Sequence, residues 1–388
     1  MKHPQDLRLN RRQWLLATTA ALTGCGGGGG NFAGAPGTGG TGIGVQGPIT
    51  GFGSVIVNNT KYDDSLAHVY LDGLQFNSVN GLPFNSTDLR VGMVANISGS
   101  LDAGGASGSA SRIDVWSIAR GTVSPVDVTG SSFSMVGMTF STDMATCFDG
   151  LANLASITNN NTPLAVWGEQ TSADAHSWRA TRVKFLPSSP TTTVSTGLFD
   201  ASTLMLNGMP LSGSLVSGFA DRQLLRVEGS FNSSANVLDV TKATAITAAQ
   251  LFAPSGLVEI EGVVTAFTST TDFYIGTIHV DASGPGTSGV SLGSLVEVTG
   301  NMQGVKLIAT KVEIESGSLR TRIEITGLVG PSPSLSAFEV RGQKCNASTA
   351  RVTQIGSSIL QEGTKVHVIG ISQGDETLRV DSIEIGVP

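Results

Sequence analysis

The stretch Leu295-Val-Glu-Val-Thr-Gly300 alternates apolar with polar side chains and ends on a glycine. Alternation with a period of two places every second side chain on one buried face of a β-strand. Lys365-Val-His-Val-Ile-Gly370 repeats the pattern near the C-terminus. We interpret both stretches as strands, and the pattern recurs through most of the chain.

Three marks recur five times in a fixed order. The first is a glycine followed by an apolar pair or near-pair, at Gly47, Gly121, Gly197, Gly262 and Gly327. The second is a glycine that lies two positions after a β-branched residue, at Gly99, Gly168, Gly229, Gly300 and Gly370. The third is a motif such as Ala-Thr-Lys-Val, which begins at Ala110, Ala180, Val240, Ala309 and Val380. Any one mark is weak because glycine and valine are common, but the fixed order indicates five internal repeats.

The repeats are predicted to span residues 43–119, 120–190, 191–254, 255–318 and 319–388. Each has room for about five short strands, with tight turns at dipeptides such as Asn58-Asn59 and Asn207-Gly208. The chain of 388 residues holds 50 glycines and only 14 % charged residues, which argues against long helices.

The predicted fold is therefore all-β, a tandem array of about five small OB-like five-stranded barrels or sandwiches. Modules that share sheets across their boundaries are an alternative. The last strand of each repeat runs almost directly into the first strand of the next repeat. Consecutive modules are therefore expected to contact each other in a linear array.

Residues 1–25 have the features of an export signal, with a basic region at Arg8, Arg11 and Arg12. The apolar stretch from Trp14 to Leu22 is too short to cross a bilayer. Leu22-Thr23-Gly24-Cys25 resembles the bacterial lipobox. By that resemblance, residues 1–25 are a lipoprotein signal peptide and Cys25 is the lipid attachment site.

The residues around Cys25 also bear on export and destination. The segment from Asn10 to Leu16 resembles a twin-arginine motif, and the choice between that route and general secretion stays open. Gly26 stands where an aspartate would resemble an inner-membrane retention signal, so the expected location is the cell envelope, lipid-anchored to the outer membrane. Residues 26–42 are predicted to be a glycine-rich tether between the lipid and the folded part.

Four stretches of the first two repeats carry a resemblance to a known family: Gly47 to Asn58, Leu89 to Val94, Ser111 to Val115 and Phe148 to Gly150. By these stretches the two repeats resemble the tandem OB-like domains of unknown function found in proteobacterial lipoproteins. The later repeats keep mainly the glycine marks. The resemblance implies an OB-like fold and an envelope location, and it brings no established activity or catalytic residues.

Motifs for catalysis or metal binding are missing from the sequence. The formal net charge of −7 and the lack of clustered lysine and arginine predict no nucleic-acid partner. The five histidines share no ligand spacing, so we predict no metal site and no cofactor. No Gly-x-Ser-x-Gly elbow precedes a helix, and no catalytic residue is predicted. Cys147 and Cys345 are expected to be buried single thiols.

Three tryptophans in the first two repeats, Trp116, Trp167 and Trp178, form the candidate binding surface. Aromatic faces on OB-like folds can stack against sugars or bases. The alternation places Trp167 on the opposite face from Val166, so it is either exposed to a ligand or covers a neighbouring module.

The predicted function is that of a non-enzymatic envelope lipoprotein, a scaffold or binding module for envelope proteins or polysaccharide. The alternative is a carbohydrate-processing or other hydrolytic enzyme that uses carboxylates of the first two modules. These carboxylates are Asp63, Asp64, Asp72, Asp143 and Asp149. Turn aspartates that bond nearby backbone N–H groups are the ordinary explanation for them.

Overall fold

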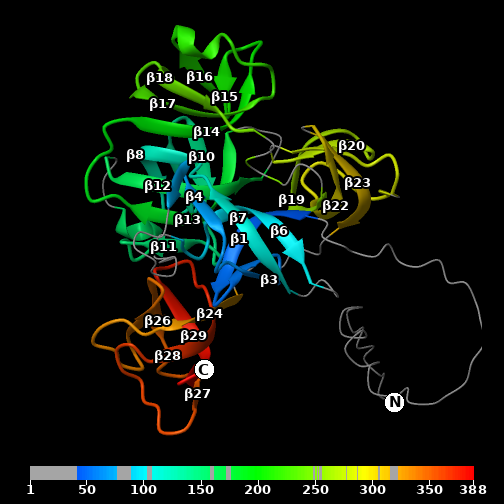
Figure 1. The fold of residues 1–388 in the computed structure, drawn as a ribbon. Coiled ribbons are helices and arrows are strands. Elements are labelled where there is room, and N and C mark those ends of the chain that lie inside the picture. The colour runs from blue at the N-terminus through cyan, green and yellow to red at the C-terminus, as the bar shows by residue number, and fades with distance from the viewer. Residues whose placement is uncertain are drawn as a thin grey trace, which may run out of the picture. The chain divides into compact units, whose positions relative to one another are not determined.

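The computed structural model describes residues 42–76, 89–102, 107–157, 161–171, 176–247, 250, 252, 256–276, 278–285, 287–304, 306–314 and 322–388. Apart from two short 3-10 turns, the described elements are strands, which confirms the all-β prediction (Figure 1). Among these residues no helix has the length and hydropathy that crossing a membrane requires.

Barrel 1 shows the arrangement that the other four repeat. Its strands are β1 (Gly42–Phe52), β2 (Val55–Val57), β3 (Thr60–Asp63), β6 (Val94–Leu101) and β7 (Ser107–Val115). The first strand pairs antiparallel with the second and fourth, the second with the third, and the fourth with the fifth. The third and fifth strands pair in parallel and close the barrel. This is a five-stranded Greek-key barrel of OB type.

The remaining barrels use the same connections. Barrel 2 contains β8 (Ala119–Asp127), β9 (Ser132–Met135), β10 (Met138–Ser141), β12 (Pro163–Gln170) and β13 (Ser177–Phe185). Barrel 3 contains β14 (Thr193–Asp200), β15 (Met205–Leu206), β16 (Met209–Ser212), β17 (Leu224–Asn232) and β18 (Val237–Ala245). Barrel 4 contains β19 (Gly256–Ser269), β20 (Asp272–Ile275), β21 (Ile278–Asp281), β22 (Leu295–Gln303) and β23 (Lys306–Ile314).

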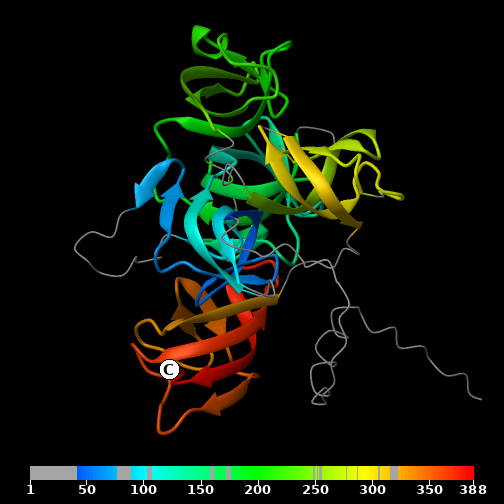
Figure 2. The ribbon, with the colours of Figure 1, turned by 45° about the vertical axis from the view of Figure 1, so that its right-hand side comes forward.

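Barrel 5 contains β24 (Arg322–Leu328), β25 (Phe338–Val340), β26 (Gln343–Asn346), β28 (Lys365–Ile371) and β29 (Thr377–Ile385). A bridge between Val329 and Val340 links its first and second strands. Figure 2 shows its orange and red strands curling into a barrel. Short extra strands follow the third strand in three barrels and pair with the fifth: β4 (His68–Leu71), which forms a hairpin with β5 (Leu74–Phe76), then β11 (Cys147–Asp149) and β27 (Arg351–Gln354).

The second glycine mark is a β-bulge in all five barrels. The register between the fourth and fifth strands shifts at Gly99, Gly168, Gly229, Gly300 and Gly370. The extra residue in the opposite strand is the second residue of the third mark, such as Thr310. A Cβ on Gly300 would lie 2.1 Å from the Ile308 carbonyl oxygen, and the other four glycines face a carbonyl at 1.9 to 2.4 Å. The bulge therefore requires glycine.

The first glycine mark makes room for the turn between the second and third strands. The first turn residue has a positive φ in each barrel, as at Asn58 and Asn207, so the predicted turns are present. The Asn207 amide donates to the Thr196 carbonyl oxygen at 2.9 Å, and a Cβ on Gly197 would lie 1.8 Å from its Oδ1. The glycine thus lets the asparagine reach the backbone of the first strand.

First strands also pair between barrels. Gly42 to Gln46 of β1 run parallel to Gly256 to Ile260 of β19, and Gly51-Phe52 pair with Glu324-Ile325 of β24. Val194-Ser195 of β14 pair with Ala119-Arg120 of β8. Sheets are thus shared across modules, which is the alternative arrangement named above, and β1 pairs with strands of barrels 4 and 5. Gly42 to Gln46 extend past the part of β1 that pairs with β2, and the shared sheet satisfies their backbone groups.

Candidate functional site

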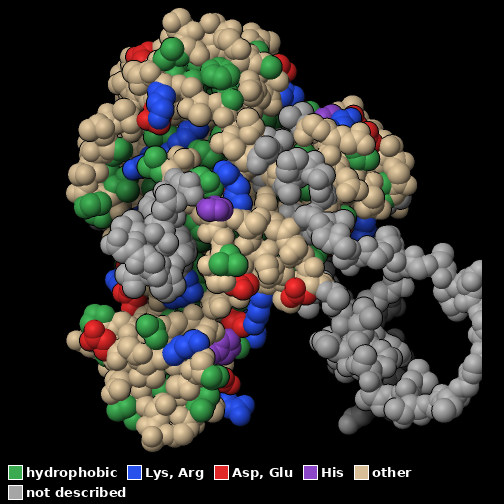
Figure 3. All heavy atoms as spheres, viewed as in Figure 1, with side chains coloured by type: hydrophobic (Ala, Val, Ile, Leu, Met, Phe, Trp, Pro, Cys, Tyr) green, Lys and Arg blue, Asp and Glu red, His purple; other side chains and the backbone are tan. Residues whose placement is uncertain are grey.

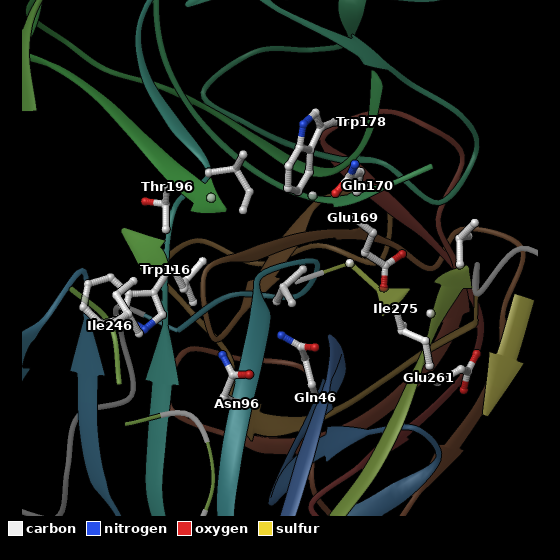
Figure 4. A pocket seen from close by; sticks show the side chains of 18 residues that line it. Gln46, Asn96, Trp116, Glu169, Gln170, Trp178, Thr196, Ile246, Glu261 and Ile275 are labelled. Carbon is white, nitrogen blue, oxygen red and sulfur yellow. The ribbon is translucent and has the colours of Figure 1, made fainter. Parts of the chain in front are cut away.

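A pocket lies where barrels 1 to 4 meet. It opens onto about 770 Å³ of empty space, a volume that includes its mouth. One wall is the shared sheet of β6, β1 and β19, in which Asn96 lies across from Gln46 and Gln46 across from Ile260. The ends of β12 and β13 supply Glu169, Gln170 and Trp178 from the other side (Figure 4). We call this cavity the four-barrel pocket.

Much of the pocket wall is apolar. Trp116 and Trp178 are 8 % and 4 % exposed, and both line the space. Figure 4 shows their rings on different sides of the pocket, with Ile246 beside Trp116 and Ile275 on the opposite wall. Flat aromatic faces and a few polar groups in one concave site are typical of a small-molecule or sugar site.

Two buried polar atoms of the pocket have no hydrogen-bond partner among the described residues. They are Oδ1 of Asn96 and Nε1 of Trp116, and their side chains line the same wall. A buried polar group without a partner costs about 1–3 kcal/mol. Both atoms are fully buried, so a ligand in the pocket would bond to them only after the lining side chains move.

A second cavity, which we call the groove, adjoins the pocket. It holds about 940 Å³ of empty space with its open side included, and it shares Gln170 and Gly276 with the pocket. Barrel 3 supplies most of its wall, including Asp200 and Asp221. The Arg222 guanidinium lies 3.8 Å from the centre of the Tyr274 ring. The groove thus continues from the pocket along barrel 3.

A buried ion-pair network fixes the chain next to Trp116. Arg226 is 6 % exposed, and its Nη2 lies 3.0 Å from Oδ2 of Asp72. The Asp72 carboxylate also accepts from the backbone N–H of Ser117 at 2.8 Å, and Arg226 donates to the Thr196 hydroxyl at 3.0 Å. Burial lowers the pKa of Arg226, and the charge of Asp72 opposes that shift. The network joins barrels 1, 2 and 3 behind the pocket.

All three predicted tryptophans are buried. Trp116 and Trp178 meet at the pocket, whereas Trp167 does not line it. Val166 belongs to the core shared by barrels 2 and 3, and Trp167, at 3 % exposure, belongs to the core of barrels 1 and 5. The alternation thus places the two side chains on opposite faces, and Trp167 covers a neighbouring module instead of facing solvent.

The candidate carboxylates are held by separate partners. Asp72 binds Arg226, Asp143 lies 3.4 Å from Arg179, and Asp149 lies 2.6 Å from Arg182. Asp63 is exposed and accepts from the Ser65 N–H, which lowers its pKa. Burial raises the pKa of Asp64, and the charge of Arg341 opposes that shift. These are the contacts of structural ion pairs and turns, and none of the five residues lines the pocket or the groove.

Other predicted sites fall outside the pocket. Cys25 and the leader lie outside the described residues. Cys147 and Cys345 are buried and form no disulfide, and burial raises the pKa of both thiols, that of Cys345 to about 12. The part of the chain that the structure describes contains no group of three or more His, Cys, Asp or Glu side chains that could hold a metal. Figure 3 shows basic and acidic side chains interspersed over the face in view.

The fold and the pocket define a class: an array of OB-type barrels in which residues of four barrels line a pocket at their junction. Residues 120–184, which form barrel 2, match the model of a family described as a domain of unknown function, DUF5666. No curated protein matches the chain. The matched family description names no activity, so the functional argument rests on the site itself.

Proposed function

We propose that this protein is a non-enzymatic binding protein of the bacterial envelope that holds a segment of envelope polysaccharide in the four-barrel pocket. Lipid on Cys25 would anchor it to the outer membrane, and the glycine-rich segment 26–42 would separate the barrels from the lipid. The observation that carries the proposal is the pocket lining: two tryptophan faces beside the polar atoms of Asn96 and Trp116 that lack partners among the described residues.

The lining matches the chemistry of a sugar. A pyranose ring has apolar C–H faces that pack on an indole, and its hydroxyls both donate and accept hydrogen bonds. Gln46, Asn96 and Gln170 add amide groups of both kinds around the space. A purely apolar ligand would leave these groups unsatisfied.

A hydrolase that uses Asp63, Asp64, Asp72, Asp143 and Asp149 has less support. A glycosidase needs two carboxylates that flank one bond, at separations of about 5 to 10 Å across a cleft. Four of the five predicted aspartates instead bind an arginine or a turn N–H group, and none of the five lines either cavity. If the protein were a hydrolase of this kind, alanine at Asp63 and Asp64, which leaves the buried Asp72–Arg226 pair intact, would abolish activity while the chain stays folded.

We expect the Trp178→Ala variant to bind polysaccharide about thirtyfold more weakly, a loss of roughly 2 kcal/mol typical of a central aromatic contact. The measurement is calorimetric titration of the full chain, purified in detergent, with fractionated envelope polysaccharide. The matched control is Trp167→Ala, because that tryptophan is equally buried but lies outside the pocket.

A second variant distinguishes a loss of binding from a loss of folding. Asn96→Ala removes an oxygen that has no partner within the described part of the chain, so the fold should tolerate it while sugar binding weakens. Full affinity in both Trp178→Ala and Asn96→Ala would contradict the proposal. So would an equal loss in Trp167→Ala with its fold intact.

A further inference from the structure

A third cavity is lined by barrels 1 and 5, and basic side chains outnumber acidic ones in its lining. It opens onto about 720 Å³ of empty space, a volume that includes its open side. Its basic residues are Lys61, Arg341 and Lys365, and Glu324 is the one acidic residue among the described lining residues. None of these four lines the four-barrel pocket or the groove. We call this space the 1–5 cavity.

The fold of barrel 5 directs Arg341 toward barrel 1. Arg341 lies in the turn between β25 and β26, with a φ of 50°. A Cβ on Gly327 of β24 would lie 2.7 Å from Cγ of Arg341, so the first glycine mark makes room for the arginine stem. The guanidinium lies 4.8 Å from the centre of the Phe52 ring, which belongs to β1. A cation of barrel 5 is thus held against the surface of barrel 1.

Barrels 1 and 3 use the same turn position differently. There the residue is an asparagine, and its amide donates to the backbone of the first strand, at 3.2 Å for Asn58 and 2.9 Å for Asn207. An arginine side chain is longer than an asparagine side chain and has no acceptor. At this position it reaches past the first strand of its own barrel to the neighbouring one.

The Arg341 guanidinium makes no hydrogen bond or ion pair within the described part of the chain. Its contacts there are the Phe52 ring and the charges of Asp64 and Arg90, which are opposite in sign. Stacking on the ring covers a face of the guanidinium, whereas the N–H groups lie in its plane. Arg341 can therefore donate to a ligand in the 1–5 cavity without giving up a bond to the protein.

The two lysines of the cavity supply further donors. Nζ of Lys61 lies 2.6 Å from Oε1 of Glu324, and Nζ of Lys365 donates to the Pro388 backbone oxygen. An ammonium has three N–H donors, so each lysine can also bind a second partner. The charges of Lys61 and Glu324 cancel, and Arg341 and Lys365 then give the described lining a net positive charge.

We propose that the 1–5 cavity binds a phosphate group, with Arg341 as the principal donor and Lys61 and Lys365 as further donors. The planar guanidinium can bind two oxygens of one phosphate. A phosphate monoester carries about −1.5 to −2 charges at pH 7, so it matches several cations better than a singly charged carboxylate does. Free phosphorylated sugars and lipid headgroups both present this group. The site is separate from the four-barrel pocket, and the proposal does not depend on sugar binding there.

The test is a calorimetric titration of the full chain, purified in detergent, with glucose 6-phosphate and with glucuronate. We expect glucose 6-phosphate to bind about tenfold more tightly than glucuronate at low salt, because it brings more charge and more acceptor oxygens. Added salt should weaken binding, since screening acts on charges at an open cavity.

A third probe, a short-chain phosphatidic acid, distinguishes the two sources of the phosphate. Ile56 and the exposed Leu328 line the same cavity and could pack on acyl chains. Tighter binding of the phosphatidic acid than of glucose 6-phosphate would support a lipid headgroup as the ligand. Equal or weaker binding would support a free phosphorylated sugar.

Variants assign the binding to the cavity. Arg341→Gln should weaken binding of glucose 6-phosphate about tenfold or more, the loss expected for a charge-assisted pair of bonds. Arg341→Lys should recover part of the affinity, because it restores the charge but not the planar fork. Lys365→Gln changes an exposed side chain and should weaken binding about threefold. Arg351→Gln is the matched control, since Arg351 is an exposed arginine of the same barrel outside the cavity.

Several results would overturn the proposal. They are an unchanged affinity for glucose 6-phosphate in a folded Arg341→Gln variant, an equal loss in Arg351→Gln, and binding of glucuronate as tight as that of glucose 6-phosphate. Absence of binding by both phosphate probes at millimolar concentration would overturn it as well. Trp178→Ala should leave the phosphate affinity unchanged, and a loss in that variant as large as in Arg341→Gln would place the phosphate outside the 1–5 cavity.

Discussion

Replacing Gly300 by alanine is expected to destabilise barrel 4 by about 3 kcal/mol or more, because the new methyl group cannot fit the bulge. Its Cβ would lie 2.1 Å from the Ile308 carbonyl oxygen and 2.8 Å from the Ala309 Cα. Both atoms belong to the backbone of β23, which is hydrogen-bonded to β22 on both sides of the bulge. Relief requires the two strands to separate locally, and paired backbone bonds would be lost.

The matched control is Gly284→Ala in the same barrel. There the nearest atom to an added Cβ is 3.6 Å away, an ordinary contact distance. Calorimetric unfolding of the full chain should show a large loss for Gly300→Ala and a change within about 0.5 kcal/mol for the control, as for most permissive surface changes. If both substitutions change the unfolding free energy by equally small amounts, the bulge does not exclude a side chain at Gly300.

Replacing Asp72 by alanine is expected to cost about 3–5 kcal/mol, because it leaves a buried guanidinium without its carboxylate. Arg226 would keep its bonds to Thr196 and Ser117 but lose the counter-charge at 3.0 Å. The backbone N–H of Ser117 would lose its acceptor as well. Chemical denaturation of the full chain gives the free energy difference.

Asp63→Ala is the matched control, since Asp63 belongs to the same predicted carboxylate group but is exposed. It should cost about 1 kcal/mol or less, as expected for one exposed turn bond. The double variant Asp72→Ala with Arg226→Met should recover part of the loss, because a methionine leaves no buried charge. If the free-energy changes of Asp72→Ala and Arg226→Met simply add in the double variant, the two side chains do not interact directly, which would contradict the ion pair.

Sequence periodicity predicted the strands and the turns because both depend on local chemistry. Alternation identified β22 and β28 directly, and Asn58 and Asn207 marked turns with positive φ. The repeated glycines proved to be sites where a Cβ would meet backbone or a turn side chain. Such close approaches leave a fixed spacing in the sequence, and the spacing carried the OB-like prediction.

The pocket could not be predicted in the same way, because four barrels contribute to it. It depends on parallel pairing of β1 with β19, between segments that are far apart in the sequence and carry no complementary pattern. The burial of Trp167 has the same origin: alternation gives its face, but only the neighbouring barrel decides whether that face is covered.

One signal in the sequence does point to the pocket. The residue before the first glycine mark lies opposite a residue of the fourth strand in every barrel, as Gln46 opposite Asn96 and Glu261 opposite Glu297 show. In barrels 1, 3 and 4 this residue, Gln46, Thr196 or Glu261, lines the pocket. The framework repeats while this position varies, which is the pattern expected where equivalent positions build one composite site.

The lipid anchor at Cys25, the outer-membrane location and the polysaccharide partner remain predictions from the leader and the pocket chemistry. Labelling cells with a radioactive fatty acid would test the anchor separately from binding. The central claim, that sugar occupies the four-barrel pocket, depends on the two tryptophans that line it.

The most direct measurement of that claim is indole fluorescence during a polysaccharide titration, with Trp14 replaced by phenylalanine in every protein. A Trp167→Phe variant keeps the indoles of Trp116 and Trp178, and its emission should shift and saturate with bound sugar. A variant that carries phenylalanine at positions 116 and 178 keeps only Trp167, outside the pocket, and its emission should stay constant. A shift from Trp167 alone, or none from the pocket pair at saturating sugar, would contradict the account.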